Sequence, residues 1–147
     1  MQQQRPSEEV ADLKITLMHS DPQIWRSVRV PTMIGLHHLH EIIQCLYQWN
    51  ESHLHSFYVE GIEYQNPDNS FGTDDRGNKP KNEKLLKLAS IIENEIGEFR
   101  YIYDFGDHWE FSIQIVNVQM LVKLEENLIL LIGENASPPE DIGGIPG

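Results

Sequence analysis

The feature that most constrains this fold is the stretch YIYDFGDHWEF at residues 101–111, where large apolar residues alternate on both sides of a short polar turn. The alternating residues on the two sides of the turn are Phe99, Tyr101, Tyr103, Trp109, Phe111, Ile113 and Ile115. A period of two is typical of a strand with one buried face. Two such strands joined by a tight turn predict an antiparallel hairpin, with strands at 99–104 and 109–118.

The same periodicity predicts further strands elsewhere in the chain. Residues 10–18 and 24–30 alternate, and a turn cluster separates them, so we expect a second antiparallel hairpin. Residues 53–59 form another predicted strand, and 62–64 are expected to pair back on it. Residues 65–81 are rich in Asn, Asp, Gly, Pro and Lys, which indicates a loop that could hold a short strand at Phe71.

Two segments have the spacing of amphipathic helices. Apolar residues three, four and seven positions apart predict a main helix at 36–49, with Gly35 as its N-cap. A shorter helix is expected within residues 85–92. Cys45, the only cysteine, falls in the main helix, where we expect a small buried hydrophobic residue. A single cysteine excludes an intrachain disulfide.

The order of these elements predicts an α+β fold: a mostly antiparallel sheet with one main helix packed across it and a second short helix. The ββαβ start resembles a grasp-type fold. We expect a disordered tail at 1–9 and a single domain at 10–147 that ends in an acidic Pro/Gly-rich loop, which includes Glu140 and Asp141.

The charge of the chain narrows the classes of partner. A net charge of −12 repels the phosphate backbone and disfavours general nucleic-acid binding. Basic residues nevertheless gather in one segment, as either a solvated surface or an interaction patch: Arg76, Lys79, Lys81, Lys84 and Lys87. No apolar run reaches the ~20 residues that span a bilayer, and MQQQRPSEEV has no signal-peptide pattern. We therefore expect no membrane partner and a cytoplasmic protein.

The hairpin turn gathers three ionisable residues: Asp104, Asp107 and His108. One interpretation is structural, with Gly106 supplying a positive φ and the carboxylates accepting main-chain N–H bonds. In the other, the turn binds a divalent cation, or one carboxylate acts as a general base.

His53 and His55 form an H-x-H pair on a predicted strand, with their Cα atoms about 7 Å apart on one face. Such a pair could bind zinc if Asp104, Asp107 or His108 supplied a third ligand. The alternative is structural, with His53 near the helix C-terminus and His55 half-buried and hydrogen-bonded. His37 and His40 are expected on a solvated helix face. Phosphate-binding loops, serine-hydrolase elbows and H-E-x-x-H motifs are missing from the sequence.

Four stretches taken together resemble the plasmid pRiA open-reading-frame-three-like family: LKITLMHSDPQIWRSVRVP from Leu13, LHHLHEIIQCLYQWNESHLHSFYV from Leu36, YIYDFGDHWEF from Tyr101 and SPPEDIGG from Ser137. The resemblance implies a compact α+β domain associated with plasmids and mobile elements, and implies no activity, cofactor or catalytic residue. Family members often carry cysteines in a C-P-P-E-D-C-G-G segment. Here Ser137 and Ile142 take those places, and Leu130 lies near an upstream one, so a thiol-based role is lost.

Three functions fit these observations. The first is a binding module for a protein or small ligand, with a polar pocket edged by Arg26, Trp49 and Trp109. Its polar residues would be His53, His55, Asp104, Asp107 and His108. The second is a metal-assisted hydrolase that uses His53 and His55 with Asp104 or Asp107. The third is an acidic decoy or inhibitor protein. The sequence favours the first, without catalysis and without a cofactor.

Overall fold

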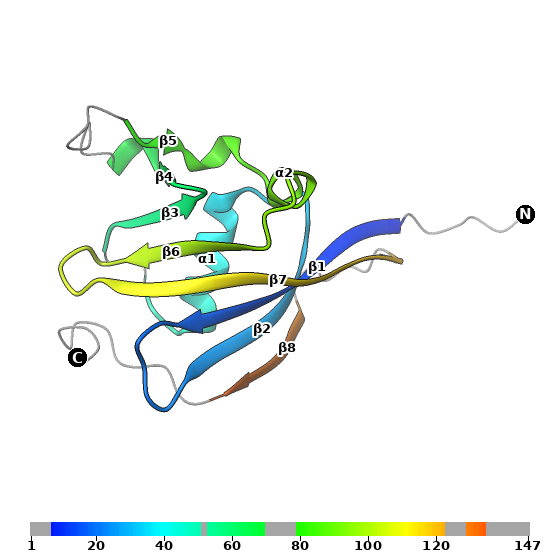
Figure 1. Ribbon diagram of the computed structural model, residues 1–147, viewed down its shortest axis with the longest axis horizontal. Coiled ribbons are helices and arrows are strands. Elements are labelled where there is room, and N and C mark those ends of the chain that lie inside the picture. Colours follow the sequence, from blue (N-terminus) through cyan, green and yellow to red (C-terminus); the bar gives the residue numbers. More distant parts are fainter. Residues whose placement is uncertain (1–6, 51–52, 70–78, 123–128, 135–147) are drawn as a thin grey trace, which may run out of the picture.

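The computed structural model describes residues 7–50, 53–69, 79–122 and 129–134. Their strands form one eight-stranded sheet in the order β5-β4-β3-β6-β7-β1-β2-β8 (Figure 1). The strands are β1 (Ser7–Leu17), β2 (Ile24–Pro31), β3 (His55–Val59), β4 (Ile62–Gln65), β5 (Lys81–Asn82), β6 (Glu98–Tyr103), β7 (Trp109–Val122) and β8 (Ile129–Glu134). The helices are α1 (Leu36–Leu46) and α2 (Leu88–Glu93), with short 3-10 turns η1 (Pro67–Asn69) and η2 (Glu83–Leu85). The α+β fold with one main and one short helix is confirmed.

All neighbouring strands pair antiparallel except β4 and β5, which are parallel. The two predicted hairpins, β1–β2 and β6–β7, lie side by side because β7 also pairs with β1. Helix α1 crosses behind the central strands in Figure 1. No helix within the described residues is long and apolar enough to cross a membrane.

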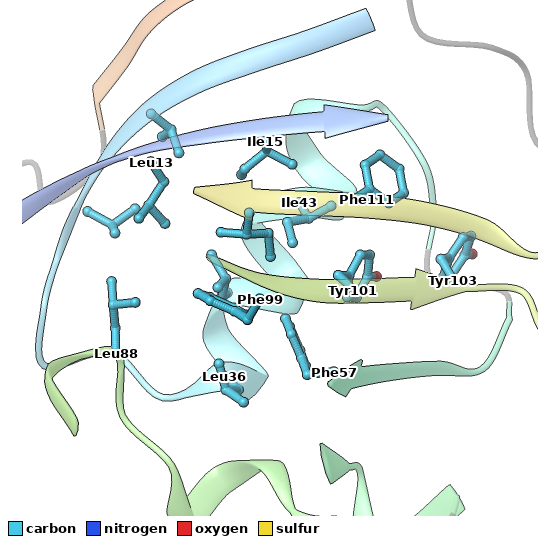
Figure 2. Packing of buried hydrophobic residues seen from close by; sticks show 14 of the residues in the cluster. Leu13, Ile15, Leu36, Ile43, Phe57, Leu88, Phe99, Tyr101, Tyr103 and Phe111 are labelled. Carbon is cyan, nitrogen blue, oxygen red and sulfur yellow. The ribbon is translucent and has the colours of Figure 1, made fainter. Parts of the chain in front are cut away.

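The core lies between α1 and one face of the sheet, where the alternating positions of the strands meet the helix (Figure 2). Leu13 and Ile15 from β1, Tyr101 from β6 and Phe111 from β7 are all 0% exposed. Each large side chain buried in this way stabilises the fold by about 1.5–3 kcal/mol. In both hairpins, the alternating apolar residues therefore point into the core, as their periodicity predicted.

Several boundaries differ from the predicted ones. Strand β1 begins at Ser7, inside the expected tail, and Glu9 accepts a hydrogen bond from Thr32 Oγ1. The expected second helix is divided into η2 and α2. Strand β8 is an additional strand that pairs with β2. The expected strand at Phe71, Arg76 of the basic segment and the C-terminal loop all lie outside the described residues.

Helix α1 ends three residues earlier than predicted, because the chain turns at Gln48. The N–H of Trp49 donates to the carbonyl of Gln44, and the N–H of Gln48 donates to that of Cys45. Gln48 has a φ of 59°. These are the two hydrogen bonds of a Schellman motif, with Gln48 at the left-handed position that glycine usually takes. The motif directs Trp49 back against the core.

Two expectations for helix α1 are wrong. Cys45 is exposed, whereas His40 is only 8% exposed. The buried stripe follows i, i+3, i+4 spacing through two polar residues, His40 and Gln44, because the hydroxyl of Tyr101 lies opposite and bonds to both. Cys45 lies one position beyond Gln44, which turns it about 100° away from this stripe.

Candidate functional site

The turn between β6 and β7 is organised around the carboxylate of Asp104. Its Oδ1 accepts hydrogen bonds from the N–H groups of Gly106 and Asp107, at 3.1 and 3.2 Å. The N–H of His108 donates to the carbonyl of Asp104, which closes the turn. Asp104 is 8% exposed. The structural interpretation of this residue, as an acceptor that fixes the turn, is therefore confirmed.

The structural interpretation of the sequence expected Gly106 to supply the left-handed backbone of this turn. The structure shows that Gly106 does not. Asp104 and His108 have φ angles of 60° and 57°, and Gly106 is not among the residues with positive φ. A Cβ atom on Gly106 would lie 3.3 Å from Asp104 Oδ1. A side chain at this position would therefore crowd the carboxylate, which would have to shift slightly. Aspartate and histidine are among the residues that tolerate the left-handed region best.

His53 lies beside this turn, as predicted. Its Nε2 is 3.5 Å from Asp104 Oδ2, and its ring meets the ring of Tyr103 edge-on at 5.6 Å. Its N–H donates to the hydroxyl of Tyr103, and the N–H of Asp104 donates to the carbonyl of Leu54. These bonds hold the segment before β3 against the hairpin.

Trp49 and Trp109, which were expected at the edge of a pocket, lie beneath the turn. Trp49 stacks on Tyr103 at 5.1 Å and approaches Trp109 at 5.5 Å. They are 7% and 1% exposed. Trp109 Nε1 is buried without a hydrogen-bond partner among the described residues. Both rings support the turn and contribute mainly to the core.

Arg26 lies farther along the same row of aromatic rings. Its guanidinium is 5.1 Å above the ring of Tyr47, whose centroid is 5.9 Å from that of Trp49. Arg26 Nη1 also donates to the carbonyl of Trp25. Burial raises the pKa of the Tyr47 phenol well above its ordinary value, and its hydroxyl donates to the carbonyl of Ile15. Arg26 thus contacts Tyr47, and Tyr47 in turn packs near Trp49 beneath the turn.

His55 belongs to a separate, buried cluster. Its Nε2 is 2.6 Å from Oε1 of Glu83, and the two side chains are only 6% and 2% exposed. Its ring stacks on His40, with centroids 3.5 Å apart. The glutamate comes from η2, and the second imidazole comes from α1. His55 is thus committed to a buried carboxylate, in line with the structural interpretation.

His40 is held as a neutral imidazole in this cluster. Gln44 Nε2 donates to the hydroxyl of Tyr101, and that hydroxyl lies 2.7 Å from His40 Nδ1. The Tyr101 hydroxyl therefore accepts a hydrogen bond from Gln44 and shares a second one with Nδ1 of His40. Burial, with a smaller effect from His55, lowers the pKa of His40 to about 3. His40 and Gln44 could have been found from their place on the apolar helical stripe, whereas no pattern marks Glu83.

The proposed metal ligands diverge. His53 faces Asp104 and His55 faces Glu83, so the H-x-H pair does not converge on one point. Within the described ranges, no group of three or more His, Cys, Asp or Glu residues is placed to hold a metal ion. Asp107 and His108 remain at the turn, where the side chain of His108 is 58% exposed and its Nε2 is 3.7 Å from Glu110.

The chain matches a family model across nearly its whole length. The model is described as Plasmid pRiA4b ORF-3-like protein, and it matches residues 9–147. The chain belongs to this family. The match includes the turn, both histidines of the pair and the buried cluster.

Two relatives agree with this assignment. The chain is 37% identical over 136 residues to the uncharacterized protein y4hQ of Sinorhizobium fredii (strain NBRC 101917 / NGR234), covering 92% of this chain and 67% of that protein. It resembles the crystal structure of MM3350, a protein of unknown function from Methanosarcina mazei Go1, with a TM-score of 0.83 and 32% identity. That match covers 94% of this chain and 76% of the other. Both relatives support the family and its fold.

Proposed function

We propose that this chain is a binding module whose protein partner contacts the exposed side of the Asp104–Trp109 turn. The observation that carries this proposal is a division of roles within the turn. Asp104 holds the backbone through its carboxylate, while Phe105 and the side chain of His108 are 39% and 58% exposed. The turn is therefore fixed by the Asp104 carboxylate and by main-chain groups, whereas the side chains of Phe105 and His108 are available to a partner.

The hydrogen-bonded backbone of the turn supports this function. Asp104 and His108 both adopt left-handed backbone conformations, and such residues cost about 1–3 kcal/mol each. Backbone strain of this kind is typical of binding and catalytic sites. A loop already held in one conformation loses less entropy when a partner binds, and an exposed aromatic ring is a common anchor in interfaces.

The shape of the hairpin favours a macromolecule over a small ligand. The tip of the β6–β7 hairpin projects beyond the ends of the neighbouring strands in Figure 1. A projecting tip can enter a groove on another protein, whereas a small ligand requires a concave site. The family description names a plasmid, so we place the partner in plasmid or mobile-element biology and the interaction in the cytoplasm.

Site-specific photo-crosslinking in cells that naturally carry the protein tests this proposal. A photoreactive phenylalanine analogue would replace Phe105 in one variant and Met120, which is 60% exposed on β7, in a matched control. We expect one discrete adduct from position 105 and none from position 120. Adding His108→Ala to the position-105 variant should weaken the adduct while the amide NMR spectrum shows an intact fold.

The same experiment separates the turn from the acidic-decoy hypothesis. Contacts driven by the net charge of −12 would form at both positions and would disappear at high salt, because screening shortens the range of exposed charges. Equal adducts at positions 105 and 120, or none at 105, would therefore overturn the proposed role of the turn.

A further inference from the structure

A groove lies at the opposite end of β3 from the turn. It has a volume of about 400 Å³. Its lining residues come from the β3–β4 hairpin and from the segment that enters β5: Tyr58, Gly61, Ile62, Glu63, Lys79, Pro80 and Lys81. The volume falls within the range of roughly 300–1,000 Å³ that is typical of small-molecule sites. The groove shares no residue with the turn between β6 and β7, so a ligand of the groove is argued from separate observations.

The charge of the groove contrasts with that of the chain. Lys79 and Lys81 line it and are exposed, on a chain that carries 23 acidic and 11 basic residues. Neither lysine forms an ion pair with another residue of the part of the chain that the structure describes. Two ammonium groups at one groove attract an anion and repel a cation.

Among the described residues that line the groove, the only carboxylate is already engaged by the protein. Glu63 Oε2 accepts hydrogen bonds from Ser56 Oγ at 2.7 Å, and from Tyr58 and Gln65 at 2.9 Å each. These three donors disperse its charge, so Glu63 competes less for the lysines. The bond from Tyr58 also fixes the orientation of its ring at the groove.

The groove also has an apolar part. Tyr58 and Ile62 are 36% and 41% exposed and belong to the few large hydrophobic side chains that are exposed among the described residues. Their positions are fixed by the hairpin, in which Glu60 and Gly61 have φ angles of 48° and 79°. Two positive φ angles in a two-residue connection are those of a type I′ turn. Pairing of Tyr64 with Lys81 holds the basic segment alongside.

We propose that this groove binds a small organic anion, with a carboxylate or phosphate group held between Lys79 and Lys81 and a ring or branched aliphatic group against Tyr58 and Ile62. The two lysines define the anionic end of the ligand, and Tyr58 and Ile62 define the rest. Part of the basic segment thus acts as a ligand site, and its remaining exposed lysines, Lys84 and Lys87, lie outside the groove.

Titration with phenyl phosphate, followed by amide NMR, tests the site in the full chain. We expect saturable shifts at the amides of Gly61, Ile62 and Lys81. The double variant Lys79→Gln/Lys81→Gln should weaken binding by about tenfold or more, because it removes both cations and leaves exposed, uncharged side chains. The matched control Lys84→Gln/Lys87→Gln removes the same charge outside the groove and should leave the affinity unchanged.

Two more probes separate the parts of the ligand. Benzyl alcohol lacks the anionic group and inorganic phosphate lacks the ring, so both should bind more weakly than phenyl phosphate. Ile62→Ala should weaken binding of phenyl phosphate and leave that of inorganic phosphate unchanged. The proposal is overturned by an absence of saturable shifts, by equal losses in the two double variants, or by inorganic phosphate binding as tightly as phenyl phosphate. None of these results depends on the role of the β6–β7 turn.

Discussion

His53 and His55 are separated by one residue, yet they lie in regions with opposite character. His55 is inside the buried cluster, where its partner Glu83 is 1% exposed and a second imidazole stacks on its ring. His53 is at the rim, with its side chain 28% exposed beside the carboxylate of Asp104. The histidine at position 55 therefore contributes to the buried core, whereas the histidine at position 53 lies at the edge of an exposed turn.

The comparison shows that the surroundings of a histidine decide what it can do. In the buried cluster the polar side chains bond to one another, and each of these residues is 8% exposed or less. At the turn, one carboxylate organises the backbone and leaves neighbouring side chains exposed. The H-x-H pattern alone would place both histidines in one metal site, whereas their surroundings place them in two separate regions.

Replacing each histidine by alanine tests this contrast most strongly. His55→Ala leaves the carboxylate of Glu83 buried and unpaired, so we expect it to lower the free energy of unfolding by about 3–5 kcal/mol. His53→Ala removes a partly exposed contact, and we expect a loss of about 1 kcal/mol or less. Urea denaturation of both variants measures the difference.

The double variant His55→Ala/Glu83→Ala provides the control for this interpretation. If the loss in His55→Ala comes from the unpaired carboxylate, adding Glu83→Ala should recover part of it. Equal losses for His53→Ala and His55→Ala would show that the two regions do not differ as described.

The buried cluster should also make stability depend on pH through His40. Its pKa falls from 6.5 to about 3 on folding, so the unfolded chain binds a proton that the folded chain does not. Stability from this residue is fully present above pH 6.5 and is lost as the pH falls from there towards 3. The slope is about 1.4 kcal/mol per pH unit in this window.

His40→Gln isolates this contribution. Other groups add to the acid sensitivity of both proteins, among them Asp12, whose pKa is lowered by its hydrogen bond to Arg29. The difference in unfolding free energy between wild type and His40→Gln should therefore shrink as the pH is lowered from 7 to 4. A constant difference across that range would contradict a neutral, buried His40.

Much of the fold could be predicted because its information is local. Alternation along 99–104 and 109–118 gave both the hairpin and its inward phase, since side chains on successive strand positions point to opposite faces. The position of the turn between these two strands was also predicted correctly. The identity of the left-handed residues was not, because Asp104 and His108 take those positions, while Gly106 lies close to the Asp104 carboxylate and has no positive φ.

The division of the site could not be predicted because it depends on contacts between distant segments. The partner of His55 is Glu83, 28 residues away along the chain. That glutamate lies among lysines, where the sequence indicates a solvated surface. His40 was misplaced for a related reason, since its burial depends on the hydroxyl of Tyr101, 61 residues away. The helical stripe marks the position of His40 as buried, but no periodic pattern shows which distant residue is its partner.

Changes to Asp104 should separate its role in the turn from its contact with His53. Asp104→Ala removes the acceptor of two main-chain N–H groups, so we expect a loss of about 1–2 kcal/mol in unfolding free energy. Asp104→Asn keeps an acceptor oxygen and tolerates the left-handed backbone, and we expect less than half of that loss. Thermal and urea denaturation provide the measurement, and equal losses in the two variants would argue against the turn-fixing role of the carboxylate.

The smallest expected effect concerns Gln48, which ends helix α1 and directs the chain towards both regions. Its φ of 59° suits glycine better than a residue with a Cβ atom. We expect Gln48→Gly to stabilise the fold by up to about 1 kcal/mol, because relief of the left-handed strain exceeds the added flexibility of the unfolded chain. Gln48→Val should instead destabilise it, since a β-branched residue is strongly disfavoured there. Neither change touches His53 or His55, so the amide shifts of both regions should persist, and stabilisation by valine would show that the Schellman motif does not define the end of this helix.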